Sequence, residues 1–273
     1  MDQLVNVFGA TGFIGSRYSA LFPSLIQGRE DNKPKTNDIL YFISTTDNYN
    51  VFDNLYLDVN TNLIKLLKVL EEIRKDPVDI TFNFISSWFV YGDNKLPVNE
   101  EAYCNPKGFY SITKRCAEQL LISFCQTYKI NYRILRLCSV YGECDKGVSA
   151  KKNAFQFLVN KLKENSPIGL YWGGDFLRDF MYVDDVCRAI NLIITEGNKN
   201  EIYNVGSGVG TSFKELIMLA KSKLQSTSNI TTVAPSEFHK IVQVKDMVLD
   251  STKLFGLGFK PLVTIEEGVQ KLI

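Results

Sequence analysis

The chain has 273 residues, of which 45% are hydrophobic and 22% are charged, a composition typical of globular proteins. Its 31 basic and 30 acidic residues leave a formal net charge of +1, which gives no electrostatic basis for binding nucleic acid or an anionic membrane. Because no apolar run approaches the length of a membrane span and the first residues lack a signal-peptide pattern, we expect a cytoplasmic protein.

Strand and helix signals alternate along the first half of the chain. The expected strands are short apolar runs, and the expected helices have apolar residues at helical spacing. In chain order, the pattern predicts a strand at 3–10, a helix at 13–22, a strand at 24–29, a loop at 30–38, a strand at 39–45, a helix at 58–75, a strand at 79–87, a helix at 110–128 and a strand at 131–142. This alternation predicts an α/β fold with a largely parallel sheet.

Beyond about residue 147 the pattern becomes looser. It predicts a helix at 154–164, a short hairpin strand at 168–174 and a helix at 183–197 that is capped by Asp184 or Asp185. We therefore expect a nucleotide-binding domain at 1–165, interleaved with later segments near 178–206, and a smaller lobe, mainly 166–273, that binds the substrate.

The motif "GATGFIG", residues 9–15, joins the first predicted strand to the first predicted helix. Glycines at this GxxGxxG spacing permit a tight turn and a close approach of backbone to ligand, and the helix N-terminus offers free N–H groups to a pyrophosphate. Glycine turns between strand and helix also occur for packing reasons. The position after the first strand of an alternating chain favours dinucleotide binding.

The motif "YSITK" places Tyr110 and Lys114 four residues apart, on one face of a predicted helix. A tyrosine hydroxyl with an ordinary pKa near ~10 is a weak base at neutral pH. A lysine ammonium one turn away, together with an oxidised nicotinamide, is expected to lower that pKa. Upstream, "FISSWFVYG" ends a predicted strand with two adjacent serines, whose hydroxyls could bind a substrate oxygen. The alternative is that Tyr110 and Lys114 are only a pair on the helix surface with no catalytic role. The order of the three motifs disfavours this alternative.

Six cysteines and one histidine limit other kinds of chemistry. The cysteines form no CxxC pair, and in a chain of this size without a secretion signal we expect reduced, mostly buried thiols. His239 is the sole histidine, which argues against a histidine metal site and against a Ser-His-Asp triad. The sequence therefore predicts no metal site.

The chain resembles an extended short-chain dehydrogenase/reductase of the nucleotide-sugar epimerase/dehydratase/reductase group. The resemblance rests on seven motifs in their expected order, namely "GATGFIG", "FISSWFVYG", "PKGFYSITK", "LRLCSVYG", "LRDFMYVDDV", "IYNVGSG" and "LGFKPLVTIEEGV". It implies a Rossmann-type doubly wound parallel sheet with a smaller C-terminal substrate lobe. It also implies NAD(P)-dependent hydride transfer on a nucleotide-diphosphate sugar, in carbohydrate biosynthesis.

The same resemblance implies roles for individual residues. Tyr110 is the general acid/base, Lys114 holds the nicotinamide ribose, and Ser87, four residues before the tyrosine of "VYG", is the catalytic serine rather than Ser86. Arg178 contacts the nucleotide or diphosphate of the substrate, for which a guanidinium fork is well suited. The implied cofactor-binding set is Gly9, Thr11, Gly12, Phe13, Ile14, Gly15, Arg29, Ser44, Tyr110 and Lys114, and the implied substrate-binding set is Ser87, Trp88, Ser139 and Arg178.

Three departures from the family pattern bear on function. Trp88 and Phe89 stand where 4,6-dehydratases have an Asp-Glu pair, so we expect no water elimination; these rings either wall the site or pack the core. Ser139 replaces a frequent asparagine that contacts substrate. Arg29, where NAD-preferring members have an acid, suits a 2′-phosphate and favours NADP(H), although Glu30 and a solvated arginine keep NAD(H) open.

We therefore predict an NADP(H)-dependent reductase of a 4-keto nucleotide sugar. An NAD-dependent nucleotide-sugar 4-epimerase, which would use the same residues, is the main alternative. A non-catalytic NAD(P)-binding regulatory protein is a third, disfavoured by the intact Ser87, Tyr110 and Lys114. The resemblance also implies a homodimer formed through the helix at 61–73 and the helix that carries Tyr110.

Overall fold

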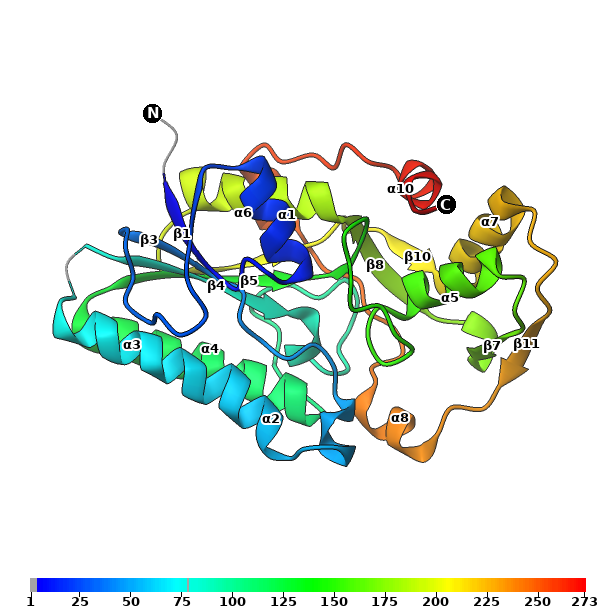
Figure 1. Ribbon diagram of the computed structural model, residues 1–273, viewed down its shortest axis with the longest axis horizontal. Coiled ribbons are helices and arrows are strands. Elements are labelled where there is room, and N and C mark those ends of the chain that lie inside the picture. Colours follow the sequence, from blue (N-terminus) through cyan, green and yellow to red (C-terminus); the bar gives the residue numbers. More distant parts are fainter. Residues whose placement is uncertain (1–3, 78) are drawn as a thin grey trace.

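The computed structural model describes residues 4–77 and 79–273 and shows a six-stranded parallel sheet with helices on both faces (Figure 1). The strand order is β2-β1-β3-β4-β5-β9, and every neighbouring pair is parallel. These strands are β1 (Val5–Phe8), β2 (Ser24–Ile26), β3 (Asp38–Tyr41), β4 (Thr81–Ser87), β5 (Asn131–Leu137) and β9 (Glu201–Val205). The predicted doubly wound α/β fold is confirmed; Gln3, the predicted start of the first strand, lies outside the described residues.

Two pairs of helices cover the two faces of this sheet. On one face α1 (Phe13–Leu21) packs on α6 (Val183–Glu196), and on the other α3 (Lys65–Lys75) lies beside α4 (Phe109–Tyr128) (Figure 1). Each face has its own buried apolar cluster, one around Val7, Leu135 and Ile190 and one around Phe82, Leu121 and Ile134. Strands buried on both faces explain why the strand segments are near-continuous apolar runs.

The second half of the chain adds two small sheets beside the large one. Their orders are β10-β8-β6 and β11-β7. The strands are β6 (Ser139–Tyr141), β7 (Ile168–Tyr171), β8 (Leu177–Tyr182), β10 (Gly210–Ser212) and β11 (Ile230–Val233), and the helices are α5 (Ala154–Lys163), α7 (Phe213–Leu224), α8 (Glu237–Val242), α9 (Thr252–Gly256) and α10 (Ile265–Leu272). The predicted hairpin at 168–174 is wrong, because β7 pairs in parallel with the distant β11.

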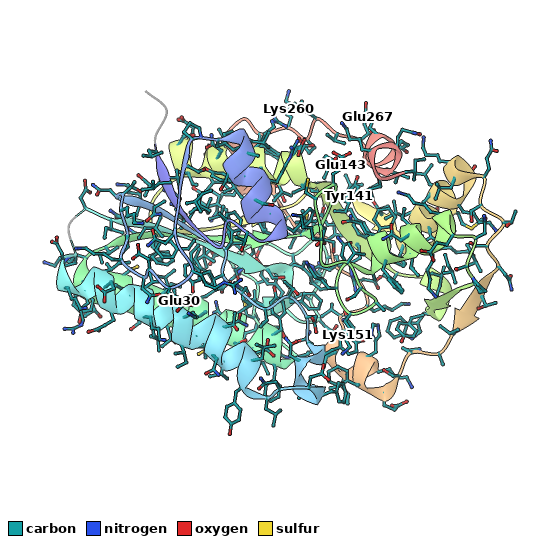
Figure 2. The ribbon with its side chains drawn as sticks, in the orientation of Figure 1. Glu30, Tyr141, Glu143, Lys151, Lys260 and Glu267 are labelled. Atoms are coloured by element: carbon teal, nitrogen blue, oxygen red, sulfur yellow. The ribbon has the colours of Figure 1, made fainter. Side chains whose placement is uncertain are left out.

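Tyr141 joins this second half together. Its ring packs edge-on against Phe155 and Tyr182, and Figure 2 shows it close to α10. A Cβ at Gly268 of α10 would lie 2.0 Å from the Tyr141 hydroxyl, so a glycine is needed for this close approach. Tyr141 belongs to β6, because the predicted strand 131–142 is divided at Cys138 into β5 of the large sheet and β6 of the small one.

The predicted helix 58–75 begins earlier and contains a π-helical stretch. It runs through α2 (Tyr56–Asp58), the π-helical η2 (Val59–Ile64) and α3. The wider turn buries Asn62, whose amide donates to the hydroxyls of Thr45 and Thr113 and accepts from Ser44. Such π-helical turns are often found at functional sites. Here it fixes the loop that follows β3.

The prediction that Asp184 or Asp185 caps α6 is wrong. The N-cap residue is Tyr182, and both aspartates lie in the first turn. Asp184 forms a two-bond ion pair with Arg17 of α1, with Oδ1 2.6 Å from Nε. Asp185 accepts the backbone N–H groups of Leu262 and Val263. Each carboxylate thus ties α6 to a distant segment, a contact that the local sequence does not encode.

All six cysteines are free, and Cys125, Cys138 and Cys187 are buried while Cys144 is exposed. Within residues 4–77 and 79–273, none of the helices combines the length and the apolar character needed to cross a membrane. The same residues contain no group of three or more His, Cys, Asp or Glu side chains placed to hold a metal ion.

Candidate active site

A cavity of about 740 Å³ lies at the carboxyl ends of β1, β3, β4 and β5. The strand order changes direction between β1 and β3, and ligands of open α/β sheets bind at this kind of switch point. The far wall comes from the second half of the chain, through β7, the loop before β8 and α8. The cavity therefore lies between the large sheet and the C-terminal elements.

The glycine loop forms one end of the cavity and fits a dinucleotide. Gly9 has a φ of +86°, and a Cβ on Gly15 would lie 2.4 Å from the carbonyl oxygen of Gly9. Gly12 is the N-cap of α1, with no side-chain hydrogen bond at the cap and no acidic residue in the first turn. The first N–H groups of α1 are thus free for pyrophosphate oxygens, and Phe13 and Ile14 also line the cavity.

Of three other residues of the predicted cofactor set, Ser44 lies at the cavity, whereas Thr11 and Arg29 do not. Ser44 lines the cavity, and its hydroxyl donates to Asn62 Oδ1 at 3.0 Å. Thr11 and Arg29 are exposed and are not among the residues that line the cavity. Arg29 also lies three residues past the end of β2, which is shorter than predicted because Gln27 turns inward and holds the following loop.

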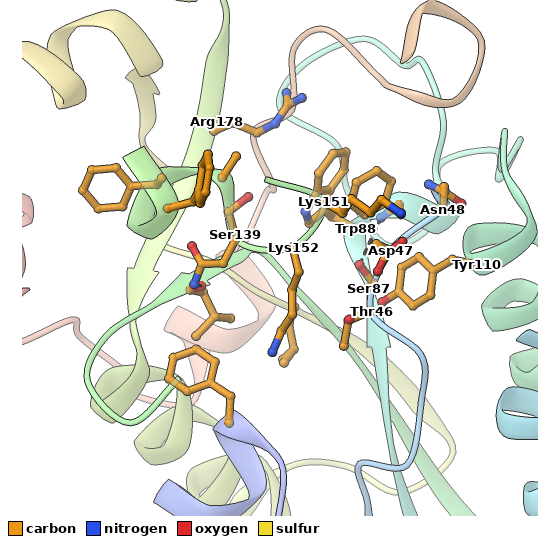
Figure 3. A pocket seen from close by; sticks show the side chains of 18 of the residues that line it. Thr46, Asp47, Asn48, Ser87, Trp88, Tyr110, Ser139, Lys151, Lys152 and Arg178 are labelled. Carbon is orange, nitrogen blue, oxygen red and sulfur yellow. Dashed lines mark hydrogen bonds between the residues drawn. The ribbon is translucent and has the colours of Figure 1, made fainter. Parts of the chain in front are cut away.

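Ser87 and Tyr110 lie side by side in the wall of the cavity (Figure 3). Ser87 is the last residue of β4, and Tyr110 lies in the first turn of α4; both are less than a tenth exposed. Burial raises the pKa of Tyr110 to about 12, the Ser87 hydroxyl acts to lower it, and the carboxylates of Asp58 and Asp47 raise it. Lys114 is not among the groups that shift this pKa, and the lowering expected from Lys114 together with an oxidised nicotinamide stays a prediction.

The geometry of Lys114 explains its absence from these groups. Its ammonium is buried, donates to the carbonyl oxygen of Ile85 at 2.5 Å, and lies 4.2 Å from the centre of the Phe84 ring. Burial lowers the pKa of Lys114 to about 7, against the raising effect of the Glu118 carboxylate. The Lys114 side chain is therefore directed at β4, and near neutral pH it is protonated in only part of the protein molecules.

Behind Lys114, a buried ion pair fixes α4 on the sheet. Arg136 of β5 donates to both oxygens of Glu118, at 3.0 and 2.8 Å, and both side chains are almost fully buried. Arg115 adds a third bond to the same carboxylate. A satisfied buried network of this kind restricts how α4 can sit on β5, and so holds Tyr110 in place.

Aromatic rings separate Tyr110 from Arg178. Trp88 stacks on Phe89 with ring centres 3.8 Å apart, and Phe89 meets Tyr110 edge-on. The Arg178 guanidinium lies 4.8 Å from the Trp88 ring and donates to the carbonyl oxygen of Lys245 at 2.7 Å. Burial lowers the pKa of Arg178 to about 10, so it remains charged at neutral pH. Trp88 and Phe89 thus line the cavity and also pack, Trp88 against Phe89 and Phe89 against Tyr110.

Several lining residues were missed by the sequence interpretation. Ser139 lines the cavity as predicted, but so do Asp47, Lys151, Lys152, Tyr171 and His239. Asp47 lies six residues after the end of β3, in the polar run "STTDN" past the carboxyl end of that strand, and this position could have identified it. The others lie far from the motifs in sequence, and no local signal marks them.

His239 connects the two sides of the cavity mouth. Its Nδ1 lies 2.9 Å from the Tyr49 hydroxyl, and its ring centre is 4.5 Å from that of Tyr171. Beside it, the rings of Phe238 and Phe52 are 4.6 Å apart. Burial, together with Arg178, lowers the pKa of His239 to about 4, so the ring is neutral at physiological pH.

The chain has the features of an NAD(P)-dependent enzyme of the extended short-chain dehydrogenase/reductase class. These features are a parallel doubly wound sheet, a glycine loop after the first strand, and a serine, a tyrosine and a lysine around one cavity. Residues 39–206 match the model of the NAD dependent epimerase/dehydratase family. The chain belongs to this family.

Individual relatives agree with this membership. A protein of Methanocaldococcus jannaschii, named provisionally as a UDP-glucose 4-epimerase, is 32% identical over 247 residues, which are 89% of this chain and 79% of the relative. The UDP-glucose 4-epimerase of Thermotoga maritima, solved with UDP-glucose, is 25% identical with a TM-score of 0.85 and covers 99% of this chain and 97% of its own. RMD from Pseudomonas aeruginosa, solved with NADPH, has the same TM-score and coverage at 23% identity, which shows the shared fold.

Proposed function

We propose that the protein is a reductase of a 4-keto nucleotide-diphosphate sugar, with hydride transfer at sugar C4. Ser87 and Tyr110 lie side by side on the cavity, where they could serve hydride transfer in either direction. The observation that supports reduction in particular is Arg29, which has no ion pair among the described residues and suits the 2′-phosphate of NADP(H), the cofactor that a reductase would consume.

In this mechanism the protein supplies the proton and the orientation. A bound reduced nicotinamide supplies the hydride to C4. Tyr110 donates its proton to O4 as the carbonyl π electrons move onto that oxygen, and the Ser87 hydroxyl donates a hydrogen bond to the same atom. Lys114 binds the nicotinamide ribose once its ammonium leaves the Ile85 carbonyl. Solvent then returns a proton to Tyr110.

The proposed cofactor preference is NADP(H), through Arg29. The two acids next to it, which could compete for its charge, are engaged elsewhere. Glu30 pairs with Lys65 at 3.4 Å, and Asp31 pairs with Lys35 at 3.0 Å. Within the described residues Arg29 has no ion pair, so its guanidinium is available to a 2′-phosphate projecting from the adenosine ribose.

Arg178 is proposed to bind the diphosphate of the substrate. Its Nη atoms donate to backbone carbonyls, whereas its Nε has no hydrogen-bond partner among the described residues. The guanidinium is charged, lies 4.8 Å from the centre of the Trp88 ring and is located on the cavity wall. The proposed division of the chain follows, with the nucleotide cofactor on the large sheet and the sugar nucleotide against the C-terminal lobe.

A nucleotide-sugar 4-epimerase is the second candidate. It is favoured by the similarity to the Methanocaldococcus jannaschii and Thermotoga maritima proteins described above. An epimerase would oxidise C4 and reduce it again with a retained cofactor, so the net reaction would consume none. Cofactor consumption therefore separates the two candidates.

The test is an assay of NADPH oxidation with 4-keto-6-deoxy sugars of UDP, dTDP and GDP. We expect stoichiometric NADPH oxidation with one of them, and we expect Arg29→Ala to raise the KM for NADPH about tenfold while leaving that for NADH unchanged. Arg74→Ala, which removes an exposed arginine of α3, is the control. Interconversion of UDP-glucose and UDP-galactose with no net change in cofactor, and no oxidation with any ketone, would assign the epimerase instead.

A further inference from the structure

The reacting end of the cavity contains a carboxylate with one free oxygen. Asp47 lines the cavity beside Ser87 and Tyr110, and Figure 3 shows the three side chains directed at the same region. Asp47 Oδ1 accepts the backbone N–H of Tyr49 at 2.8 Å, and Oδ2 has no hydrogen-bond partner among the described residues. A ligand that binds Ser87 and Tyr110 would therefore lie close to this free carboxylate oxygen.

A second carboxylate lies behind the first. Asp58 is 1% exposed and accepts from the Thr45 hydroxyl and the Asn50 amide through Oδ1. Its Oδ2 is buried without a hydrogen-bond partner in the part of the chain that the structure describes. Asp47 and Asp58 both act on Tyr110 as negative charges, so their combined potential reaches the hydroxyl at which the reaction is proposed to occur.

Neither carboxylate forms an ion pair with the cations near this point. Lys151 lines the cavity and acts on Asp47 from a distance as a positive charge, but its Nζ pairs at 3.2 Å with Asp53, an exposed carboxylate whose negative charge also acts on Asp47. Lys114 is directed at the carbonyl oxygen of Ile85. Neither Asp47 nor Asp58 has an ion pair within residues 4–77 and 79–273. Arg178 lies on the other side of Trp88, at the proposed diphosphate site.

We propose that Asp47, supported by the charge of Asp58, is a specificity-determining residue that selects nucleotide sugars with an uncharged hexose and excludes uronic acids. The inference rests on the proposed function, which places the sugar C4 oxygen between Ser87 and Tyr110. The free Asp47 oxygen accepts a hydrogen bond from a hydroxyl on a carbon next to C4. A sugar carboxylate has no proton to donate and adds a like charge to a poorly hydrated site.

The experiment measures binding to the cofactor-saturated protein by calorimetry. The probes are UDP, UDP-glucose and UDP-glucuronate, with two parallel sets: dTDP, dTDP-glucose and dTDP-glucuronate, and GDP, GDP-mannose and GDP-mannuronate. For the nucleotide that binds, we expect the neutral sugar to bind at least about tenfold more tightly than the uronate. This ratio should fall as salt is added, because the discrimination is electrostatic; exclusion by shape alone would not respond to salt.

Asp47→Asn is the informative variant, because asparagine keeps an oxygen for the Tyr49 N–H and loses the charge. We expect the hexose-to-uronate ratio to fall at least about fivefold, with binding of the nucleoside diphosphate unchanged. Asp175→Asn, which removes an exposed carboxylate next to the cavity-lining Phe176, is the control, and its ratio should stay within about twofold of the unmodified protein.

Three results would overturn the inference while leaving the proposed function in place. They are equal binding of uronate and hexose to the unmodified protein, an unchanged ratio in Asp47→Asn, and an equal loss of affinity for both sugars in that variant, which would mean that Asp47 only holds its loop. Failure of all three nucleotide sets to bind would instead overturn the proposed function, and this inference with it.

Discussion

At the scale of single residues, burial sets the chemistry of the site more than proximity does. Tyr110 and Lys114 lie one helical turn apart, yet the pKa of the first is raised to about 12 and that of the second is lowered to about 7. Both shifts have burial as their largest cause, which disfavours the charged form of either group. Burial therefore favours the protonated hydroxyl of Tyr110 and the neutral amine of Lys114.

The role of Tyr110 is tested by Tyr110→Phe. Phenylalanine preserves the ring and its contact with Phe89, but it cannot donate a proton to the sugar oxygen. We expect turnover to fall by about 10²- to 10⁴-fold, with NADPH affinity unchanged, as measured by steady-state kinetics and fluorescence titration. Tyr103→Phe, at an exposed position, is the control. Near-normal turnover in Tyr110→Phe would exclude Tyr110 as the acid.

Lys114 makes the stability of the cofactor-free protein depend on pH. Its pKa is about 7 in the folded state, against an ordinary value of 10.5, so between these values the unfolded chain binds the proton and the folded chain does not. The cost of burying the ammonium is thus complete below pH 7, and it fades as the pH rises toward 10.5. Because of Lys114, the free energy of unfolding therefore increases as the pH rises from about 7 to 10.5.

Lys114→Met removes this dependence. We expect the free energy of unfolding of the unmodified protein, relative to Lys114→Met, to rise by about 1 kcal/mol per pH unit in the middle of the window. Urea denaturation at several pH values measures it, with the exposed Lys68→Met as control. A difference between the two proteins that is constant with pH would show that Lys114 is not desolvated in the folded state.

At the scale of elements, the β1-loop-α1 unit is fixed by backbone geometry. Gly9 adopts a positive φ, and Gly15 lets the first turn of α1 approach the carbonyl of Gly9. The same approach leaves the N–H groups of that turn open toward the cavity. The loop is therefore shaped by the same glycines that allow a pyrophosphate to come close.

Gly15→Ala tests this geometry, because its Cβ would lie 2.4 Å from the Gly9 oxygen. The loop must move, and we expect the affinity for NADPH to fall at least about tenfold. Thermal denaturation reports whether the variant is still folded. Gly256→Ala, where a Cβ meets nothing within 4 Å, should change neither property. Unchanged NADPH binding by a folded Gly15→Ala would remove the loop from the cofactor site.

At the scale of the whole molecule, α3 and α4 expose apolar side chains on the face away from the sheet. Those more than a third exposed on these helices and the turns leading into them include Tyr56, Ile64, Leu67, Ile112 and Leu120. Exposed apolar side chains concentrated on neighbouring helices mark interaction surfaces. We propose that this face forms a homodimer by pairing α3 and α4 with their copies.

Leu67→Glu tests the dimer. A buried carboxylate at the interface would oppose association, so we expect a dimer for the unmodified protein and a monomer for the variant in size-exclusion chromatography with light scattering. Met218→Glu on α7, equally exposed but distant from this face, should remain dimeric. A monomeric unmodified protein would rule out the proposed interface under these conditions.

The sequence by itself determined the elements and the local motifs. Alternating apolar runs and helical spacing gave the parallel sheet, because strands buried on both faces must be apolar throughout. The order of β1, the glycine loop and α1 follows from backbone rules, and the spacing of Tyr110 and Lys114 follows from the helical period. These features depend on residues that are neighbours in the chain.

Only the tertiary structure decided which distant groups meet and how far they are removed from water. It put Asp47 and His239 on the cavity, paired β7 in parallel with β11, and turned Asp184 from an expected cap into a partner of Arg17. It also buried Tyr110 deeply enough to raise its pKa to about 12, because desolvation depends on everything packed around a group. Contacts between residues far apart in the chain have no local pattern from which to be predicted.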